Sequence, residues 1–379
     1  MKPRDDWRQR ADQVGFAYHT INGETYWDES VCYSFTLRQI EDDIESATTE
    51  LWALCKEFVS RTIDDQEAFE RMKIPRLAWN LIAESWKRND PTLYGRFDLA
   101  YDGHHPPKLL EFNADTPTAV FEAAVFQWYW LEDGLSRGFL PADGDQFNSI
   151  HEKLVTRWRE IAGGKLVHFV CMSRSVEDSG TVAYLEDCAK QAGLATDVLD
   201  VSAIGLRRNT FVDLSGRAMQ GVFKLYPWEF MFADAFGGSP AMGNTQFIEP
   251  PWKMLLSNKG MLAYLWEMEP SHPNLLPTFF EPDIRAAEVG THYARKPIWS
   301  REGANITLLD GEKVLGQTGG TYGAEGYVRQ SLVSMPEFSG NFPVIGSWIV
   351  GEVAAGMGVR EDTTCITTDR ARFVPHFIG

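Results

Sequence analysis

Cysteines are few in this sequence and follow no recognisable spacing. Among 379 residues there are five, none of them in a CxxC pair: Cys32, Cys55, Cys171, Cys188 and Cys365. An odd, scattered set of this kind argues against a disulfide framework and against a cysteine-based zinc site. We expect buried, reduced thiols, in keeping with a cytoplasmic protein.

Long apolar segments are missing as well. The N-terminal segment MKPRDDWRQRADQVGF lacks the continuous apolar core of a signal peptide, which again predicts a cytoplasmic protein. The stretch from Phe342 to Val359 is almost uncharged, but Pro343, four glycines and Glu352 interrupt it. That punctuation is typical of core strands joined by turns, so we do not expect a membrane span.

Basic residues are scarce relative to acidic ones. The chain has 36 Lys and Arg against 53 Asp and Glu, a net charge of −17. This balance disfavours nucleic acid or anionic lipid as the main partner and is compatible with a cationic substrate. With 44% hydrophobic and 13% aromatic residues, the chain can bury a large core and should form two or three closely joined domains.

The stretch from Gly95 to Glu122 predicts two β-strands that carry polar groups where a core would be apolar. Strand alternation puts Arg96 and Asp98 on one face of RFDLAY, and Glu111 and Asn113 on one face of KLLEFNAD. A hairpin would bring these faces together. Two carboxylates and an amide oxygen form the hard oxygen set that Mg²⁺ prefers, and the arginine beside them could hold an anion.

The same pattern has a plainer interpretation. Arg96 and Asp98 could form a surface ion pair on an edge strand, with Glu111 as a solvated neighbour. Against this, both strands have strongly apolar opposite faces, and the second runs into a cap-rich segment, Asp115 to Thr118, before the helix-like AVFEAAVFQWYWLED. The pattern alone leaves the metal site and the surface pair open.

The rest of the chain divides by its periodicity. Residues 1–94 are predicted to be largely helical, with a strand near Cys32 to Thr36. From Lys165, KLVHFVCM, the helix VEDSGTVAYLEDCAKQAGL and ATDVLDV predict a β-α-β unit. Glu177 and Asp178 lie where the first strand gives way to the helix, a position where α/β sheets meet ligands. Ordinary helix capping is the alternative.

Two lysines occur in apolar surroundings. Lys224 lies within the aromatic strand GVFKLYPWEFMF, and Lys296 lies in ARKPIWSREGANI, before a loop that contains Arg301. A lysine in such a strand is costly unless its ammonium reaches solvent or meets an anion. The loop could cover phosphates, whereas the glycine-rich GQTGGTYGAEG is more typical of a hairpin or lid tip.

Several segments together carry a family resemblance. In chain order they are RFDL, LLEFNADTPT, the VED turn, FKLYPWE, EPPWKMLLSNKGMLAYLWEM, KPIWSREGANI and GSWIVGEVAAGMGVRED. They resemble the synthetase part of glutathionylspermidine synthase, an ATP-grasp ligase, over nearly the entire chain. The resemblance implies an α/β fold with a helical N-terminal region that holds the hairpin (1–164), a preATP-grasp β-α-β region (165–222) and an ATP-grasp region (223–379).

The resemblance also implies site residues. The Mg²⁺ ligands would be Asp98, Glu111 and Asn113. The residues around the peptide and the transferred phosphate would be Arg96, Thr116 and Thr118, the threonines standing where the family usually has serines. The arginines acting on the reacting anion would be Arg96, Arg301 and Arg360. The nucleotide ligands would be Lys224, Lys259, Lys296 and Gln330. The polyamine ligands would be Glu177 and Asp178, with aspartate in place of one glutamate.

The implied activity is an ATP- and Mg²⁺-dependent ligase that joins a glutathione-like peptide carboxylate to a polyamine-like amine through an acyl phosphate. The bifunctional members carry a cysteine amidase domain ahead of the synthetase, and this sequence begins with the synthetase, so we do not expect it to hydrolyse its product. Leu225 replaces a threonine beside Lys224 and removes a hydroxyl near the amine. Two alternatives remain: an ATP-dependent phosphotransferase and a non-catalytic peptide- or polyamine-binding homologue.

Overall fold

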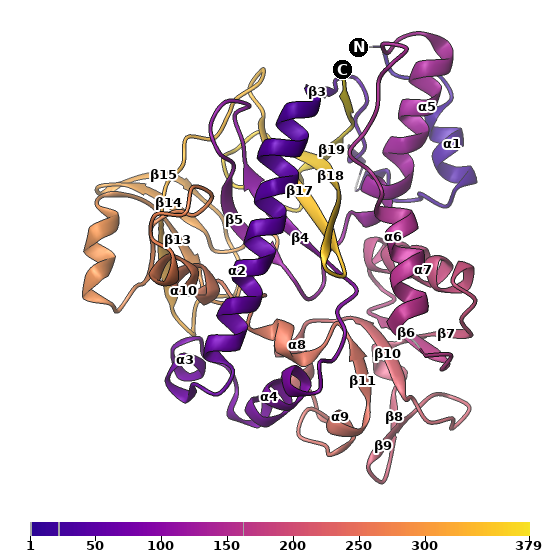
Figure 1. Cartoon of the computed structure of the whole chain (residues 1–379), viewed down its shortest axis with the longest axis vertical. Helices are drawn as coiled ribbons and strands as arrows, with labels where there is room; N and C mark the ends of the chain where they lie inside the picture. The colour runs from indigo at the N-terminus through magenta and orange to yellow at the C-terminus, as the bar shows by residue number, and fades with distance from the viewer. Residues whose placement is uncertain (1, 22, 162) are drawn as a thin grey trace.

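A five-stranded antiparallel sheet joins two distant parts of the chain. The computed structural model describes residues 2–21, 23–161 and 163–379. The strand order is β19-β18-β17-β4-β5, from β4 (Tyr94–Ala100), β5 (Lys108–Asn113), β17 (Phe342–Val350), β18 (Val353–Asp362) and β19 (Arg372–Val374). Figure 1 shows the purple β4 and β5 beside the yellow β17 and β18. The final strands therefore complete the sheet that the hairpin begins.

The predicted hairpin is confirmed with its expected faces. Asp98 of β4 lies opposite Glu111 of β5, and Arg96 lies opposite Asn113. On the other face the rings of Phe97 and Phe112 stack 3.9 Å apart. Because successive side chains of a strand point to opposite faces, this aromatic pair fixes the polar set on the face away from it.

Helices from the N-terminal part cover the aromatic face of the central sheet. The longest, α2 (Ser46–Thr62), lies along it in Figure 1, and its Trp52 contacts Phe112 edge-to-face at 6.0 Å. The prediction that residues 1–94 are largely helical, with a strand near Cys32 to Thr36, is confirmed. The other elements up to residue 161 are α1 (Trp7–Gln13), β1 (Thr20–Ile21), β2 (Glu24–Thr25), β3 (Tyr33–Phe35), η1 (Gln39–Glu45), α3 (Gln66–Arg71), η2 (Arg76–Ala78), α4 (Trp79–Lys87), the π-helical η3 (Glu122–Phe126), α5 (Gln127–Arg137) and α6 (Ile150–Ile161).

A parallel sheet confirms the predicted β-α-β unit. β6 (Val167–Cys171) leads through α7 (Val176–Gln191) to β7 (Thr196–Asp200), and β6 pairs in parallel with both β7 and β10 (Gly221–Leu225). β11 (Gln246–Ile248) completes the order β11-β10-β6-β7. The short elements around it are η4 (Val201–Ala203), β8 (Gly205–Arg207), β9 (Thr210–Val212), α8 (Trp228–Ala233), α9 (Ala241–Asn244) and η5 (Pro251–Met254).

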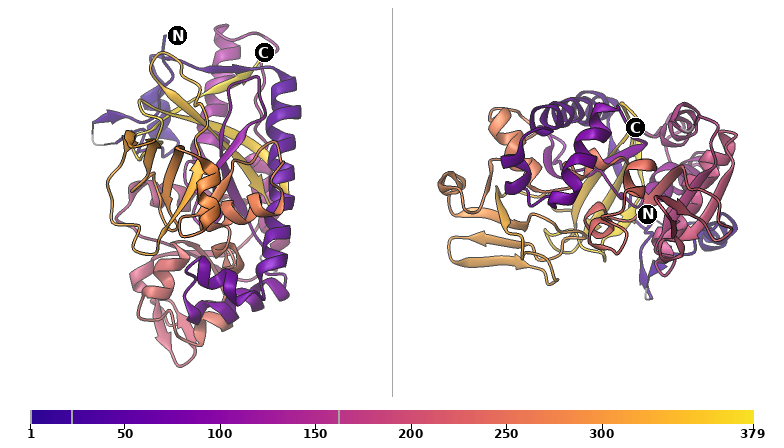
Figure 2. Two further views of the ribbon diagram at one scale, coloured as in Figure 1. Left: turned by 90° about the vertical axis from the view of Figure 1, so that its left-hand side faces the viewer. Right: turned by 90° about the horizontal axis from the view of Figure 1, so that it is seen from below.

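A third sheet lies on the opposite side of the molecule from the parallel sheet, as the right-hand view of Figure 2 shows. Its order is β12-β16-β13-β14-β15, and all its pairs are antiparallel. The elements of this part are α10 (Gly260–Met268), β12 (Thr278–Phe280), η6 (Ile284–Val289), β13 (His292–Pro297), β14 (Thr307–Asp310), β15 (Lys313–Gln317), β16 (Tyr327–Ser331) and, at the end of the chain, β20 (His376–Ile378).

The predicted division at residues 164 and 222 stays a prediction. The central sheet draws strands from the first and last predicted regions, and β10 lies next to β6 across the second boundary. The nearly uncharged Phe342 to Val359 segment forms the β17–β18 hairpin, as expected. Among the described residues, no helix combines the length and apolarity needed to cross a bilayer.

Candidate active site

The polar face of the β4–β5 hairpin holds a dense set of charges. Asp98, which is 3% exposed, accepts hydrogen bonds from Arg96 Nε at 2.6 Å and Nη2 at 3.1 Å. It also accepts from Arg360 Nη2 at 2.7 Å and from Asn113 Nδ2 at 3.1 Å. The alternative of an exposed pair on an edge strand is therefore wrong, because Arg96 and Asp98 are both buried and β4 lies between β17 and β5 in the sheet.

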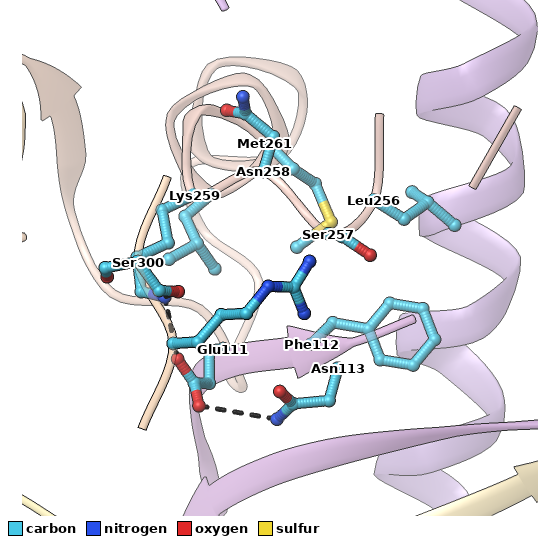
Figure 3. Close-up of a pocket in the computed structure, with 11 residues that line it drawn as sticks. Glu111, Phe112, Asn113, Leu256, Ser257, Asn258, Lys259, Met261 and Ser300 are labelled. Atoms are coloured by element: carbon cyan, nitrogen blue, oxygen red, sulfur yellow. Dashed lines mark hydrogen bonds and ion pairs between the residues drawn. The ribbon is translucent and has the colours of Figure 1, made fainter. Parts of the chain in front are cut away.

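Glu111 lies beside this cluster and faces a different cation. Its Oε2 is 3.0 Å from Lys259 Nζ, and its Oε1 accepts from Asn113 Nδ2 at 3.3 Å, as Figure 3 shows. Burial alone would raise the pKa of the Glu111 carboxyl, but the nearby Lys259, Lys296 and Arg360 hold that pKa well below its usual range. Glu111 is thus an anion at neutral pH.

The three predicted metal ligands meet in one place. The amide nitrogen of Asn113 donates to both Asp98 Oδ2 and Glu111 Oε1, so the three side chains are neighbours, with the nitrogen of Asn113 facing the two carboxylates. A cavity of about 20 Å³ adjoins Glu111 and Asn113, which is room for roughly one water molecule. Oxygen donors of this kind fit Mg²⁺, which takes few protein ligands and keeps several waters.

Lys296 and Lys259 approach Glu111 from the third sheet and its neighbouring loop. Lys296 donates to Gln330 Oε1 at 2.6 Å and to the Leu110 carbonyl at 3.0 Å. Burial lowers the pKa of Lys296 to about 8, against the raising effect of Glu111. Lys259 also donates to the Ser300 carbonyl at 2.8 Å. Both ammonium groups are therefore held by oxygens beside the predicted metal position.

Lys224 occupies a separate, fully buried position. Its ammonium forms an ion pair with Asp115, donates to the Tyr226 carbonyl at 3.1 Å and lies 4.5 Å from the centre of the Trp228 ring. Burial lowers its pKa, and Asp115 opposes that effect. Of the two possibilities left open by the sequence, contact with solvent or with an anion, the structure shows the second, and the anion is Asp115 of the chain itself. A nucleotide role for Lys224 stays a prediction.

The loop after β13 brings Arg301 to the cap-rich segment that follows the hairpin. Arg301 donates to Glu229 at 3.0 and 3.1 Å and to the Thr116 hydroxyl at 2.7 Å. Burial would lower its pKa, but Glu229 raises it. Thr118 contacts the site through its carbonyl, which accepts from Arg96 at 2.7 Å. Of the two threonines, Thr116 presents its hydroxyl to a predicted catalytic arginine.

Glu177 and Asp178 form the first turn of α7. The helix cap is Ser175, whose hydroxyl accepts from the Asp178 amide at 3.1 Å, so neither acidic side chain supplies the cap hydrogen bond. Burial, and then the charge of Glu177, raises the pKa of Asp178 to about 6. The same two effects raise the pKa of Glu302. Carboxylates from α7 and from the loop after β13 thus make one negatively charged region.

Several acidic residues that hold the predicted cations or extend the acidic region were not among the predicted site residues. They are Asp115, Glu122, Glu229 and Glu302. Asp115 could have been found, because it continues the EFNAD pattern two residues after Asn113. Glu229 and Glu302 are near Arg301 and Glu177, respectively, only because the folded chain brings distant segments together.

A family model and several known proteins match this chain over most of its length. The family model described as glutathionylspermidine synthase preATP-grasp matches residues 1–379. A putative acid–amine ligase of Haemophilus influenzae is 41% identical, over 99% of this chain and 97% of its own. A trypanothione synthetase of Crithidia fasciculata is 30% identical, over 84% of this chain and 52% of its own. The bifunctional glutathionylspermidine synthetase/amidase of Escherichia coli is 26% identical, over 97% of this chain and 63% of its own.

A solved structure extends the likeness to the fold. A glutathione synthetase-like effector of Globodera pallida superposes with a TM-score of 0.59, covering 100% of this chain and 98% of the effector at 10% identity. At that identity the likeness concerns the fold alone. The mixed α/β, ATP-grasp-related fold predicted from the sequence is confirmed.

Proposed function

The chain belongs to the glutathionylspermidine synthase family of carbon–nitrogen ligases, and on that premise we propose that it uses ATP and Mg²⁺ to join a peptide carboxylate to a polyamine-like amine. One observation carries the proposal. A cation-rich region around Asp98 and Glu111 and an acidic region around Glu177 occur in one molecule. The first suits phosphates and a carboxylate, and the second suits a protonated amine.

Mg²⁺ has a matching set of donors in Asp98, Glu111 and Asn113. Bound there, the ion would neutralise charge on the phosphates of ATP and on the transferred phosphoryl group. Of the two carboxylates, Glu111 is the more accessible, with 26% of its side chain exposed against 4% for Asp98. We therefore assign the stronger metal contact to Glu111.

The surrounding cations would hold the nucleotide and the reacting groups. Lys296, Lys259 and Arg301 are held by Gln330, Glu111 and Glu229, partners that anionic phosphates can replace. Arg96 and Arg360 lie on Asp98, where a substrate carboxylate could meet them. Positive groups in a partly buried site offset the charge that develops during phosphoryl transfer without needing to reorganise.

The reaction then takes two steps. An oxygen of the peptide carboxylate attacks the γ-phosphorus of ATP, the bond to the bridging oxygen breaks, and ADP leaves. The neutral amine nitrogen attacks the acyl carbon of the acyl phosphate, the bond from that carbon to the phosphate oxygen breaks, phosphate leaves, and the nitrogen loses one proton to solvent as the amide forms. Neither step needs a covalent bond to the enzyme, which fits a site built from cations and metal ligands and not around an activated nucleophile.

A phosphotransferase would use the same ATP and Mg²⁺ groups, and a binding protein would keep only the pocket. The acidic region favours the ligase, since a phosphate acceptor with a hydroxyl has no need of it. ADP release, measured with glutathione and spermidine added singly and together, separates the three. A ligase releases ADP and phosphate only with both and forms an amide. ADP release with one substrate and a phosphate ester as product, or no turnover with any pair of peptide and amine, contradicts the proposal.

A further inference from the structure

Glu122 is a fully buried carboxylate that takes no part in the proposed reaction. It lies at the start of the π-helical η3 and is 0% exposed. Tyr26 donates to its Oε1 at 2.6 Å, and Tyr18 donates to its Oε2 at 3.4 Å. π-Helical turns cost helix stability and occur often at functional sites. The two hydroxyls hold the carboxyl group in one orientation.

Tyr18 connects this carboxyl group to the N-terminal part of α7. The Tyr18 ring packs on the helix at Gly180, where a β-carbon would come within 2.4 Å of the ring. Gly180 is one turn after Glu177. The charge of Glu177 raises the pKa values of Tyr18, Tyr26 and Glu122, after the larger effect of burial. Glu122 and the amine region therefore share an electrostatic environment.

The groups that face Glu122 are almost all acidic or neutral. They are Tyr18 and Tyr26 from the N-terminal segment and Glu177 from α7, with Asp178 and Glu302 beyond it. The guanidinium of Arg96 also interacts electrostatically with Tyr26. Across residues 2–21, 23–161 and 163–379, Glu122 forms no ion pair with a lysine, arginine or histidine.

A buried carboxylate without a cation is costly to ionise. Burial accordingly raises the pKa of Glu122 to about 7, although the hydrogen bonds from Tyr26 and Tyr18 lower it. Because the protonated and ionised forms of Glu122 are close in free energy near neutral pH, one charge added nearby can change which form is present. An ammonium group bound at Glu177 is such a charge.

We propose that Glu122 is a proton-linked positioning residue of the amine site, which gives up its proton when a polyamine cation binds at Glu177. The inference rests on the proposed function, which places the amine there. On binding, the O–H bond of Glu122 breaks and the proton passes to solvent, while the carboxylate keeps the hydrogen bonds from Tyr26 and Tyr18. The free enzyme thus avoids one more unpaired buried charge, and the complex gains an anion behind the ligand.

The sign of the pH dependence follows. Below neutrality a bound cation must displace the proton, so amine affinity is weaker there and rises as pH passes through about 7. Glu122→Gln imitates the protonated acid at every pH. The variant should bind spermidine like the wild type at low pH and more weakly than the wild type at high pH, by up to about tenfold, the factor for a one-unit pKa change.

Calorimetric titration of spermidine into the intact protein, in two buffers of different ionisation enthalpy near neutral pH, tests the inference. The wild type should release protons on binding, and Glu122→Gln should release distinctly fewer. The exposed Glu312→Gln serves as the matched control and should behave like the wild type. Equal proton release by wild type and Glu122→Gln overturns the inference.

Two further measurements keep the outcome clear. If Glu122→Gln does not fold, infrared difference spectra of the wild type should show loss of a protonated carboxyl band when spermidine is added, and no loss overturns the inference. Glu177→Gln reports on the amine site itself. If it leaves spermidine binding unchanged, the amine site of the proposed function is wrong. If it weakens binding while Glu122→Gln leaves proton release unchanged, only the role of Glu122 is wrong.

Discussion

Arg360 in β18 donates to Asp98 Oδ2 in β4 over 2.7 Å, with 4% of the Asp98 side chain exposed. Arg96 occupies both oxygens of the same carboxylate. Asp98 therefore accepts hydrogen bonds from two arginines on strands far apart in the chain. Glu111, opposite it in the hairpin, meets one lysine and is more open. The two predicted metal carboxylates have unequal structural tasks.

Glu111→Gln should lower ligase turnover by orders of magnitude while the protein stays folded. The change keeps the shape of the side chain and removes the anion that would bind Mg²⁺. Lys259 keeps its hydrogen bond to the Ser300 carbonyl, so the loss of stability should be small. ADP release and thermal melting check both points, with Glu312→Gln as the control. Near-normal turnover would remove Glu111 from the metal ligands.

Asp98→Asn should lower both turnover and stability. Two largely buried arginines lose their shared anion, and leaving a buried charge unpaired costs about 3–5 kcal/mol. The melting temperature of Asp98→Asn should therefore fall well below that of Glu111→Gln. Equal melting temperatures for the two variants would show that the Arg96–Asp98–Arg360 cluster does not hold the sheet together.

Lys224→Met should destabilise the protein through Asp115. Both side chains of this ion pair are 0% exposed, and removing the lysine leaves a buried carboxylate with a cost of about 3–5 kcal/mol. Lys224→Met/Asp115→Asn should recover part of the loss, because it removes both charges. Denaturant unfolding of the single and double variants measures the coupling. Independent, additive effects would mean that the pair contributes no coupling energy.

The hairpin, its polar face and the β-α-β unit could be predicted because they depend on local alternation and on neighbouring segments. Glu111 and Asn113 followed from period two alone. The partners of the predicted cations could not be predicted in this way. Lys224 meets Asp115 across 109 positions and Arg301 meets Glu229 across 72. Such contacts depend on how the sheets pack, which no local pattern encodes.

Helix capping shows the same limit at short range. The sequence predicted a helix from Val176, where α7 does begin, and left capping open as the alternative role of Glu177 and Asp178. In the structure the cap is Ser175, whose hydroxyl accepts the hydrogen bond from the Asp178 amide. Serine and aspartate are both common caps, so residue type alone did not show which side chain supplies the cap.

The kcat/KM for ATP should fall as pH rises through about 8. Burial lowers the pKa of Lys296 to about 8, so its ammonium loses its proton there and attracts phosphate less strongly. The kcat/KM profile reports groups of the free enzyme. Lys296→Met should have a lower kcat/KM for ATP and lack this step. If kcat/KM for ATP in Lys296→Met still fell near pH 8, the fall would belong to another group.

The same pKa gives a stability prediction of definite sign. The folded protein binds the Lys296 proton less tightly than the unfolded chain, whose lysine has the ordinary value of 10.5. Between about 8 and 10.5 the unfolded state holds more protons, so this residue's contribution to stability rises with pH in that window. Between pH about 8 and 10.5, the unfolding free energy of the wild type should therefore rise relative to that of Lys296→Met.

Glu177→Gln should raise the KM for the amine by about ten- to a hundredfold, the loss of one charge-assisted hydrogen bond of roughly 1.5–3 kcal/mol. The KM for ATP should hardly change, because the predicted nucleotide lysines lie on other elements. Ser175→Ala is the matched control. It removes the actual cap of α7, so it should lower stability by about 1 kcal/mol and leave the amine KM nearly unchanged.

Both KM values and the melting temperature, measured on the two variants side by side, distinguish a ligand-binding role from a purely structural one. Glu177 raises the pKa values of Asp178, Glu302 and Glu122, so its charge is unfavourable in the free protein. Removing that charge should leave the melting temperature unchanged or raise it slightly. A lower melting temperature with no change in the amine KM would mean that Glu177 serves the helix and not the substrate.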